Sequence, residues 1–150
     1  MTDIHQLKAT IKELLDTQRL AVLSTNNKGQ PYSNLVAFSA SEDLKTLIFG
    51  TTRSTRKYAN LTKESRVSLL IDDRSNKVSD FFQAIAITAT GIATEIKGEE
   101  KDLLLKHYLD KHTTLKDFVQ SPTCALLKIM VEVYYVVNRF QNVQELHIKP

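Results

Sequence analysis

Apolar residues repeat at two different spacings along the chain, and these spacings predict where helices and strands lie. Near the N-terminus they recur at helical spacing from Ile4 to Leu15. Asp3, with Gln6 three positions later, is typical of a helix cap, so we predict a helix that ends at about Thr17. Two further helical stretches are predicted, one over residues 54–61 and one that opens after Gly98.

Segments rich in β-branched and aromatic residues predict the strands. These segments cover residues 20–25, 32–39, 46–50, 66–72, 84–96 and 125–137. The first two are separated by a turn-forming stretch in which Asn26, Asn27 and Gly29 tolerate positive φ, which predicts a hairpin. About six strands with short connections and two or three helices favour a closed antiparallel sheet in a mainly β (α+β) fold. At 150 residues, the chain is expected to form a single domain over residues 1–150.

The last predicted strand carries apolar side chains on both faces. Every second residue from Ala125 to Val137 is apolar, which predicts one core face. The other face also carries apolar side chains among polar ones, namely Leu126, Met130, Tyr134 and Val136. A lone solvated strand rarely exposes so much apolar surface, so this face predicts a homodimer in which a second copy covers it.

Charge and composition narrow the functional classes. The 20 basic and 17 acidic residues give a net charge of +3, which does not indicate a nucleic-acid surface. No apolar run approaches the roughly 20 residues that span a bilayer, and the N-terminus lacks a basic and apolar leader. The single cysteine, Cys124, cannot form an internal disulfide. We therefore expect a cytoplasmic protein that binds neither membrane nor nucleic acid, and the scattered histidines predict no metal site.

The densest chemical signal lies between a predicted strand and a predicted helix. Residues 51–57 read Thr-Thr-Arg-Ser-Thr-Arg-Lys, with four hydroxyls and three cations. A helix start offers free N–H groups and a positive dipole end to an anion. Arg56 can grip two phosphate oxygens, Lys57 adds a point charge, and Thr51 and Thr55 can donate hydroxyl hydrogen bonds. The same residues also suit a solvated helix cap with surface charges, and the local sequence leaves both interpretations open.

Three segments, taken together, resemble the pyridoxamine 5′-phosphate oxidase superfamily. They are residues 29–36, which read Gly-Gln-Pro-Tyr-Ser-Asn-Leu-Val, residues 49–61 and residues 66–70. The resemblance spans roughly residues 18–95 and implies a six-stranded antiparallel split β-barrel with flanking helices that binds FMN.

The resemblance also implies a set of cofactor-binding residues. Thr55, Arg56 and Lys57 correspond to the triplet that holds the flavin phosphate. Two groups that would approach the rest of the flavin are Gly50 and Thr51, near the ribityl phosphate, and Asn34, Leu35 and Val36, whose strand backbone meets the isoalloxazine ring. In a dimer, Asn138 and Arg139 would contact the flavin of the neighbouring subunit, although the same pair also suits a polar turn.

The chain departs from the resembling oxidase where that enzyme holds its substrate. Asn34 stands where the oxidase has an arginine, Ser39 where it has a lysine, and Ala86 where it has a glutamine. We therefore expect that pyridoxamine 5′-phosphate is not the natural substrate. Phe81 and Phe82 follow a polar loop; they could shape another pocket, but core aromatics are the expectation.

No side chain is assigned as a catalyst, because a bound flavin carries out hydride and electron transfer through its own ring. The expected function is an FMN-binding oxidoreductase, flavin reductase-like or oxidase-like, acting on an unidentified small molecule with a nicotinamide nucleotide or another small reductant. The alternative is a non-enzymatic binder or carrier of a flavin, haem or deazaflavin cofactor.

Overall fold

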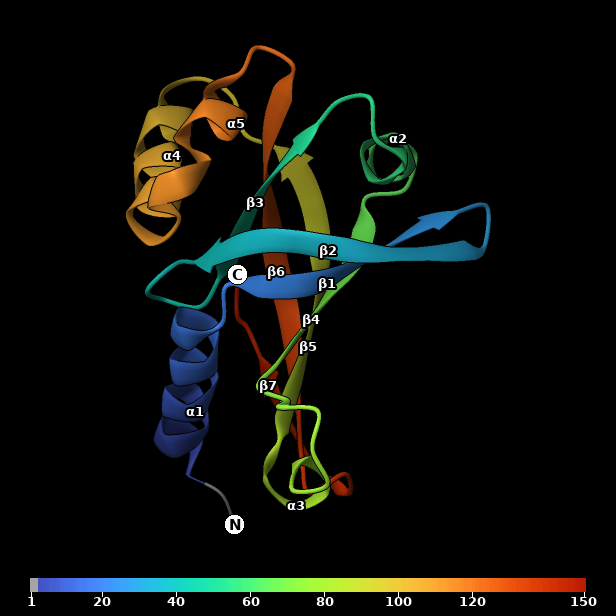
Figure 1. The fold of residues 1–150 in the computed structure, drawn as a ribbon, viewed down its shortest axis with the longest axis vertical. Helices are drawn as coiled ribbons and strands as arrows, with labels where there is room; N and C mark the ends of the chain where they lie inside the picture. The colour runs from blue at the N-terminus through green and yellow to red at the C-terminus, as the bar shows by residue number, and fades with distance from the viewer. Residues whose placement is uncertain (1–2) are drawn as a thin grey trace.

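The computed structural model describes residues 3–150, which form one antiparallel sheet with helices around it (Figure 1). The strands are β1 (Leu20–Asn27), β2 (Gln30–Ala40), β3 (Thr46–Thr52), β4 (Arg66–Asp72), β5 (Ile85–Glu95), β6 (Cys124–Asn138) and β7 (Asn142–His147). The helices are α1 (Ile4–Thr17), α2 (Arg56–Lys63), α3 (Asp80–Gln83), α4 (Glu99–Lys111) and α5 (Lys116–Gln120), with a 3₁₀ turn at Thr113–Leu115. The six predicted strands are therefore present, and β7 is an addition that the sequence pattern did not reveal.

Six of the strands close into a barrel. They are hydrogen-bonded in the order β3-β2-β1-β4-β5-β6, and β6 returns to pair with β3. β6 is long enough to pair with two strands along one edge: residues 124–130 pair with β3, and residues 133–138 pair with β7. The predicted closed antiparallel split barrel is thus confirmed, and β7 pairs with the C-terminal part of its longest strand, β6.

A bulge beside Gly91 changes which face of β6 points into the barrel. The register of β5 against β6 shifts between Thr90 and Gly91, so Glu132 has no partner in the ladder. A Cβ on Gly91 would lie 2.2 Å from the carbonyl oxygen of Met130, so only glycine lets the strands approach this closely. Before the bulge the odd-numbered residues of β6 enter the core, and after it the even-numbered ones do, beginning with Tyr134.

This switch overturns the predicted dimer face of β6. The structure buries Tyr134 and Val136 in the barrel core, and Leu126 in a second cluster beneath α4 and α5. Of the four apolar residues expected to face a partner, Met130 alone is exposed. For Tyr134 and Val136 the prediction was wrong because a strict two-residue period was carried through a bulge that adds one residue. Leu126 lies before the bulge on the predicted face, and side chains of α4 and α5 cover it.

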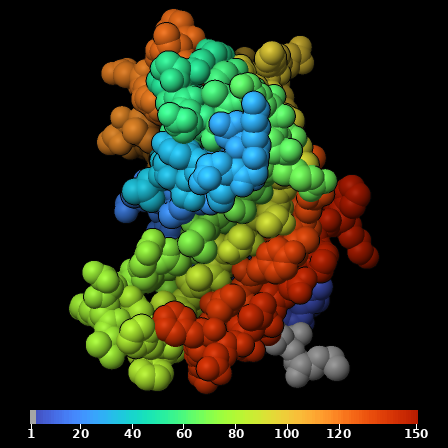
Figure 2. All heavy atoms as spheres, turned by 90° about the vertical axis from the view of Figure 1, so that its right-hand side faces the viewer, coloured from blue at the N-terminus to red at the C-terminus, as the bar shows by residue number. Residues whose placement is uncertain are grey.

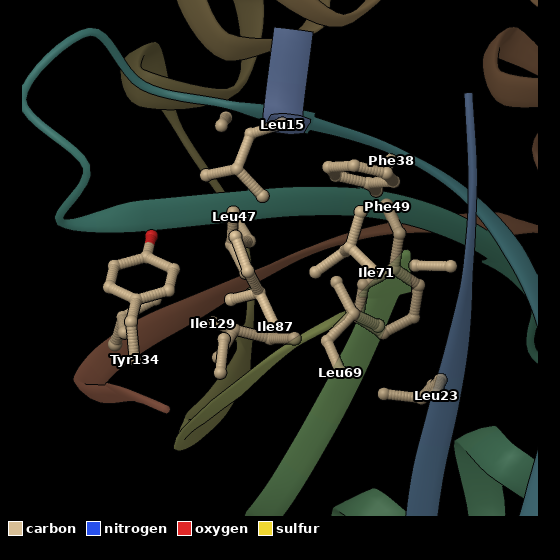
Figure 3. Packing of buried hydrophobic residues seen from close by; sticks show 14 of the residues in the cluster. Leu15, Leu23, Phe38, Leu47, Phe49, Leu69, Ile71, Ile87, Ile129 and Tyr134 are labelled. Atoms are coloured by element: carbon tan, nitrogen blue, oxygen red, sulfur yellow. The ribbon is translucent and has the colours of Figure 1, made fainter. Parts of the chain in front are cut away.

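The main core fills the barrel and extends under α1 (Figure 3). Its largest fully buried side chains include Phe38 and Phe49 from the paired part of β2 and β3, together with Tyr134. The Tyr134 hydroxyl donates to the carbonyl oxygen of Leu44 at 2.6 Å, which satisfies its one polar group inside the core. This hydrogen bond ties β6 to the loop between β2 and β3.

The N-terminal helix and the first hairpin follow their local sequence. α1 has the predicted bounds, and the Asp3 side chain caps it by accepting from the His5 N–H at 3.0 Å. The hairpin turn is tighter than expected, with Lys28 and Gly29 alone at positive φ. The Asn26 side chain accepts from the Gly29 N–H at 2.7 Å and stabilises this two-residue turn.

Phe81 and Phe82 do not lie in the core, contrary to expectation. They belong to the short helix α3, and their side chains are 51% and 70% exposed. Asp80 organises the loop before them by accepting hydrogen bonds from the backbone of Ser75 and Asn76. The aromatic pair is therefore displayed at the surface on an ordered loop.

Candidate functional site

The barrel is split where β2 and β3 separate. The two strands pair only from Phe38 to Ala40 on β2 and from Leu47 to Phe49 on β3. Beyond this point β2 continues towards the hairpin tip beside β1, whereas β3 turns towards α2 (Figure 1). Residues 30–37 of β2 therefore have no strand partner on their β3 side, and Tyr32 in this stretch lies 5.8 Å from the guanidinium of Arg56, the first residue of α2.

Tyr108 of α4 lies at the fork of the split. Its hydroxyl donates to the carbonyl oxygen of Ala37 at 3.1 Å, and the backbone N–H of Gly50 faces the Tyr108 hydroxyl oxygen. Burial raises the pKa of Tyr108 well above its usual 10, so the hydroxyl keeps the proton that it donates. This side chain therefore occupies the position where the β2–β3 ladder would otherwise continue.

The predicted hydroxyl donors build the cap of α2. The Thr55 hydroxyl donates to the Thr52 carbonyl oxygen at 2.9 Å and accepts from the Tyr58 N–H at 3.3 Å. The Thr51 side chain is buried, and its hydroxyl lies 2.9 Å from that of Thr55. Both hydroxyls are thus engaged with the chain itself, and they fix the direction in which the helix begins.

The free donors of this region come from the next two residues. Within residues 3–150, the backbone N–H groups of Arg56 and Lys57 have no hydrogen-bond acceptor. The Arg56 guanidinium is exposed and lies 5.8 Å from the centroid of the Tyr32 ring. Lys57 is half-buried with no carboxylate at ion-pair distance among the described residues, and burial lowers its pKa. An anion placed here would meet two cations and two free N–H groups.

The third cation of the segment, Arg53, is already paired. Its guanidinium donates to the carbonyl oxygen of Pro122 at 3.0 Å and to the carboxylate of Glu95 at 2.8 Å. The other carboxylate oxygen of Glu95 accepts from the Tyr58 hydroxyl at 2.7 Å. Arg53 therefore fastens the loop before α2, and the positive charge left for a ligand resides on Arg56 and Lys57.

The residues expected to meet a flavin ring alternate across β2. Leu35 is 62% exposed on the outer face, whereas Val36 is buried in the core. Asn34 points inward like Val36, and its side-chain oxygen is buried with no hydrogen-bond partner in the described chain. Gly50 has a packing role, because a Cβ there would lie 3.0 Å from Val119 of α5. The unpaired edge of β2 is thus the feature that offers backbone groups to a ligand.

Asn138 and Arg139 lie far from this group. β6 begins beside Thr52, near α2, and ends at Asn138, and at roughly 3.3 Å per residue its 15 residues span several tens of ångströms. Arg139 and Phe140 follow in a turn with φ of 50° and 60°. The structure therefore brings Gly50, Thr51 and the Thr55–Lys57 triplet together, places the β2 edge beside them, and puts Asn138 and Arg139 at the opposite end.

Sequence reasoning missed the residues that hold the site in place. Tyr108 was visible only as one of several apolar positions on a predicted helix, and Glu95 stands at the end of a predicted strand with no motif around it. Their roles depend on contacts across 71 and 37 positions, with Ala37 and Tyr58 respectively. In the described part of the chain there is no cluster of three or more metal-ligating side chains. Among residues 3–150, no helix has the length and apolarity needed to cross a bilayer.

Comparisons with known proteins agree on one family. The family model described as pyridoxamine 5′-phosphate oxidase matches residues 7–138. A Schizosaccharomyces pombe protein described as a pyridoxamine 5′-phosphate oxidase homolog is 25% identical over 173 residues, covering 94% of this chain and 90% of the relative.

Solved structures with the same fold bind different cofactors according to their descriptions. A haem-binding protein from Mycobacterium smegmatis superposes with a TM-score of 0.82 at 15% identity, covering 93% of this chain and 57% of that one. An FAD-binding protein from Mesorhizobium loti superposes with a TM-score of 0.69 at 15% identity, covering 91% of this chain and 94% of that one. At these identities the likeness establishes the fold alone.

Proposed function

This chain belongs to the pyridoxamine 5′-phosphate oxidase family, whose members usually bind flavin, and on that premise we propose that it is an FMN-binding oxidoreductase. The observation that carries the proposal is the start of α2, where Arg56 and Lys57 present two cations and two free N–H groups at one point. A phosphate monoester is the group that this donor set suits best, since it can accept from all of them.

The charge and burial of Lys57 support a resident anion. A lysine that is half-buried without a carboxylate partner is destabilising, because burial disfavours its charged form. A phosphate placed beside it would favour the charged form and offset that cost. Arg56 differs in being exposed and free to move from Tyr32 onto the phosphate, where its planar fork can bind two oxygens.

The remaining flavin contacts are proposed at the split. A phosphate at Arg56 and Lys57 would direct the rest of the molecule along the unpaired edge of β2, where Asn34 has an oxygen that lacks a donor. When bound, the flavin supplies hydride and electron transfer through its ring. The chain supplies binding and orientation, with Thr51 and Thr55 holding the cap and Tyr108 holding the strands apart.

We also propose a homodimer, on a surface other than the one expected from β6. Large apolar side chains are exposed around α3 and the turn before β7: Val78, Phe81, Phe82, Phe140 and Val143. The rings of Phe81 and Phe140 pack against each other, with centroids 5.3 Å apart. A second copy that covered this surface would carry the adjacent Asn138 and Arg139 to its neighbour, which gives these two residues a route to a flavin that they cannot reach in their own chain.

The substrate is proposed to be a small molecule other than pyridoxamine 5′-phosphate. Ser39, where the resembling oxidase has a lysine, is 1% exposed, and its hydroxyl has no partner in the described chain. A substrate phosphate would therefore find no cation at this position, and the position itself is closed to solvent. We propose a reduced nicotinamide nucleotide as the electron donor.

A haem-binding function has less support from the histidines. Haem iron needs an axial side-chain ligand. His107 of α4 and His112, which caps the end of α4, direct their Nε2 atoms at the carbonyl oxygens of Ala40 and Phe38, at 2.7 and 2.6 Å. These two histidines hold α4 against β2, whereas the free donors at the start of α2 support a flavin phosphate.

The absorption spectrum of the purified protein and a paired variant test the flavin assignment. Arg56→Ala combined with Lys57→Ala should weaken FMN binding at least tenfold, because each charge-assisted hydrogen bond contributes about 1.5 to 3 kcal/mol. The matched control replaces the exposed Lys63 and Lys106 with alanine, which removes the same charge elsewhere. Equal FMN affinity in the two double variants would refute the phosphate site.

Turnover with NADH and NADPH separates an enzyme from a carrier. An oxidoreductase should consume reduced nicotinamide at a rate that depends on bound FMN and that falls in the Arg56→Ala, Lys57→Ala protein. Stoichiometric FMN without any turnover of either nucleotide would favour the non-enzymatic binder. A Soret band in place of flavin absorption would favour haem.

A further inference from the structure

The loop before α2 and the first turn of α2 are clamped by one carboxylate. Glu95, the last residue of β5, accepts from Arg53 with one oxygen at 2.8 Å and from the Tyr58 hydroxyl with the other at 2.7 Å. Arg53 in turn donates to the carbonyl oxygens of Pro122 and Cys124 at 3.0 and 3.3 Å. The Glu95 side chain thus links β5 to the β3–α2 loop and to α2, and Arg53 extends the link to the start of β6.

We propose that Glu95 is the positioning residue that orients the start of α2 for a phosphate monoester, and so makes the chain prefer FMN to riboflavin. The inference rests on the proposed FMN function, and it adds a residue that does not touch the ligand. Glu95 acts through Tyr58, which follows Arg56 and Lys57 in the first turn of the helix.

Tyr58 fixes the orientation of the first turn of α2 because it is hydrogen-bonded at both ends. Its backbone N–H is held by the Thr55 hydroxyl at 3.3 Å, and its side-chain hydroxyl is held by Glu95. Holding one residue at both ends fixes the rotation of the first helical turn, and with it the direction of the free N–H groups of Arg56 and Lys57. Release of the hydroxyl end would leave the cap intact but would let the turn rotate.

The clamp also sets the local charge. Burial acts to raise the pKa of Glu95, but the hydrogen bonds from Tyr58 and Arg53 outweigh it and lower that pKa, so the carboxylate is charged at neutral pH. Its charge neutralises Arg53 and leaves Arg56 and Lys57 as the cations that a ligand meets. Removal of the carboxylate therefore has two opposite consequences: it loosens the helix start, and it frees a third cation nearby.

The two consequences can be separated with two variants. Glu95→Gln removes the carboxylate charge, whereas Tyr58→Phe removes one hydrogen bond and leaves the Glu95–Arg53 pair in place. The matched control is Glu132→Gln, which breaks an exposed carboxylate's pair with Arg66 at 3.2 Å elsewhere on the barrel. Fluorescence titration with FMN and with riboflavin gives an affinity ratio that isolates the contribution of the phosphate.

If Glu95 positions the helix start, both variants should lower the FMN-to-riboflavin affinity ratio. The expected change is about fivefold, which corresponds to the contribution of one ordinary hydrogen bond to binding. Riboflavin affinity and the Glu132→Gln ratio should stay near the parent values. A purely structural role would instead lower both affinities in proportion and leave the ratio unchanged, which overturns the proposal. A raised ratio in Glu95→Gln would also overturn it, because Arg53 would then be the decisive cation.

The outcome of the Arg56→Ala, Lys57→Ala protein distinguishes failure of this inference from failure of the proposed function. A ratio that collapses in that protein but not in Glu95→Gln or Tyr58→Phe keeps the phosphate site and removes the clamp. A ratio that is unchanged in all of them removes the phosphate site itself. Should Glu95→Gln fail to fold, Tyr58→Phe carries the test alone, since it keeps the ion pair.

Discussion

The two ends of the barrel differ in the kind of group that they leave without a partner: cations at the α2 end and apolar side chains at the α3 end. At the α2 end, most polar side chains are hydrogen-bonded to one another, and the cations of Arg56 and Lys57 are left without a carboxylate partner among the described residues. At the far end, α3 and the turn between β6 and β7 display aromatic side chains, with Phe81 and Phe140 in contact. In Figure 2 these segments lie together at the bottom of the molecule, away from the β1–β2 hairpin.

This difference indicates what each end still needs. Spare positive charge with free N–H groups is satisfied by a small anion. Spare apolar area is satisfied by another protein surface, since soluble monomers rarely expose several large apolar side chains side by side. The bulge in β6 turns Tyr134 and Val136 into the core. The large apolar side chains that are exposed at this end therefore lie around α3 and the turn before β7 and not on β6.

Gly91→Ala should have the largest effect on stability. Its Cβ would lie 2.2 Å from the Met130 carbonyl oxygen, and neither backbone can yield without breaking the ladder. We expect a loss of about 3 kcal/mol in the free energy of unfolding, measured by urea denaturation. Gly98→Ala is the control: nothing lies within 4 Å of its Cβ, so only the positive φ of 74° costs energy, about 1 kcal/mol. Equal losses would show that the bulge is not constrained.

Phe81→Ser combined with Phe140→Ser should dissociate the proposed dimer without unfolding the monomer. Both side chains are more than half exposed, so their loss removes little of the core. Sedimentation velocity should show the parent protein as a dimer and the variant as a monomer at micromolar concentration. Leu103→Ser on α4, 71% exposed, is the matched control and should remain dimeric. A parent protein that is monomeric with stoichiometric FMN would contradict the shared-site proposal.

The contrast between the ends also explains what the sequence could and could not predict. Local patterns predicted α1 and the bounds of β4, because each depends on neighbours in the chain, and they located the cluster of hydroxyls and cations at residues 51–57. Local patterns failed where contacts between residues distant in sequence determine which side chains are buried. The bulge at Gly91 reverses the buried face of β6, and Phe81 is exposed. The uncommitted state of Lys57 and the engagement of Arg53 with Glu95 are likewise visible only in three dimensions.

Tyr108→Phe should have a moderate effect that is centred on the split. The change leaves the Ala37 carbonyl oxygen without this donor in a partly buried position, which costs about 1 to 2 kcal/mol of stability. Because Tyr108 lies between β2 and β3, amide hydrogen exchange should rise first at Gly50 and in residues 34–37. Tyr135→Phe, at a half-buried position of β6, is the control. Unchanged exchange at Gly50 would mean that the fork does not depend on this hydroxyl.

The smallest expected effect is a rise in stability with pH that depends on Lys111. Its ammonium donates to the Leu15 carbonyl oxygen at 2.7 Å and lies 4.0 Å from the centroid of the Phe38 ring, and burial lowers its pKa from 10.5 to about 8. Between these values the unfolded chain keeps the proton that the folded chain releases, so the free energy of unfolding increases as pH rises.

Solvent screening limits this increase to about 1 kcal/mol, because Lys111 is only partly buried. Urea denaturation across the window from about pH 8 to 10.5 should show the slope, and Lys111→Met should reduce it. Lys57 contributes with the same sign, since burial lowers its pKa too, so the slope should be reduced and not abolished. Lys106→Met, at an exposed position of α4, should keep the parent slope. A slope that Lys111→Met leaves unaltered would place the titrating group elsewhere, and it would show that the contact between α4 and the end of α1 is indifferent to charge.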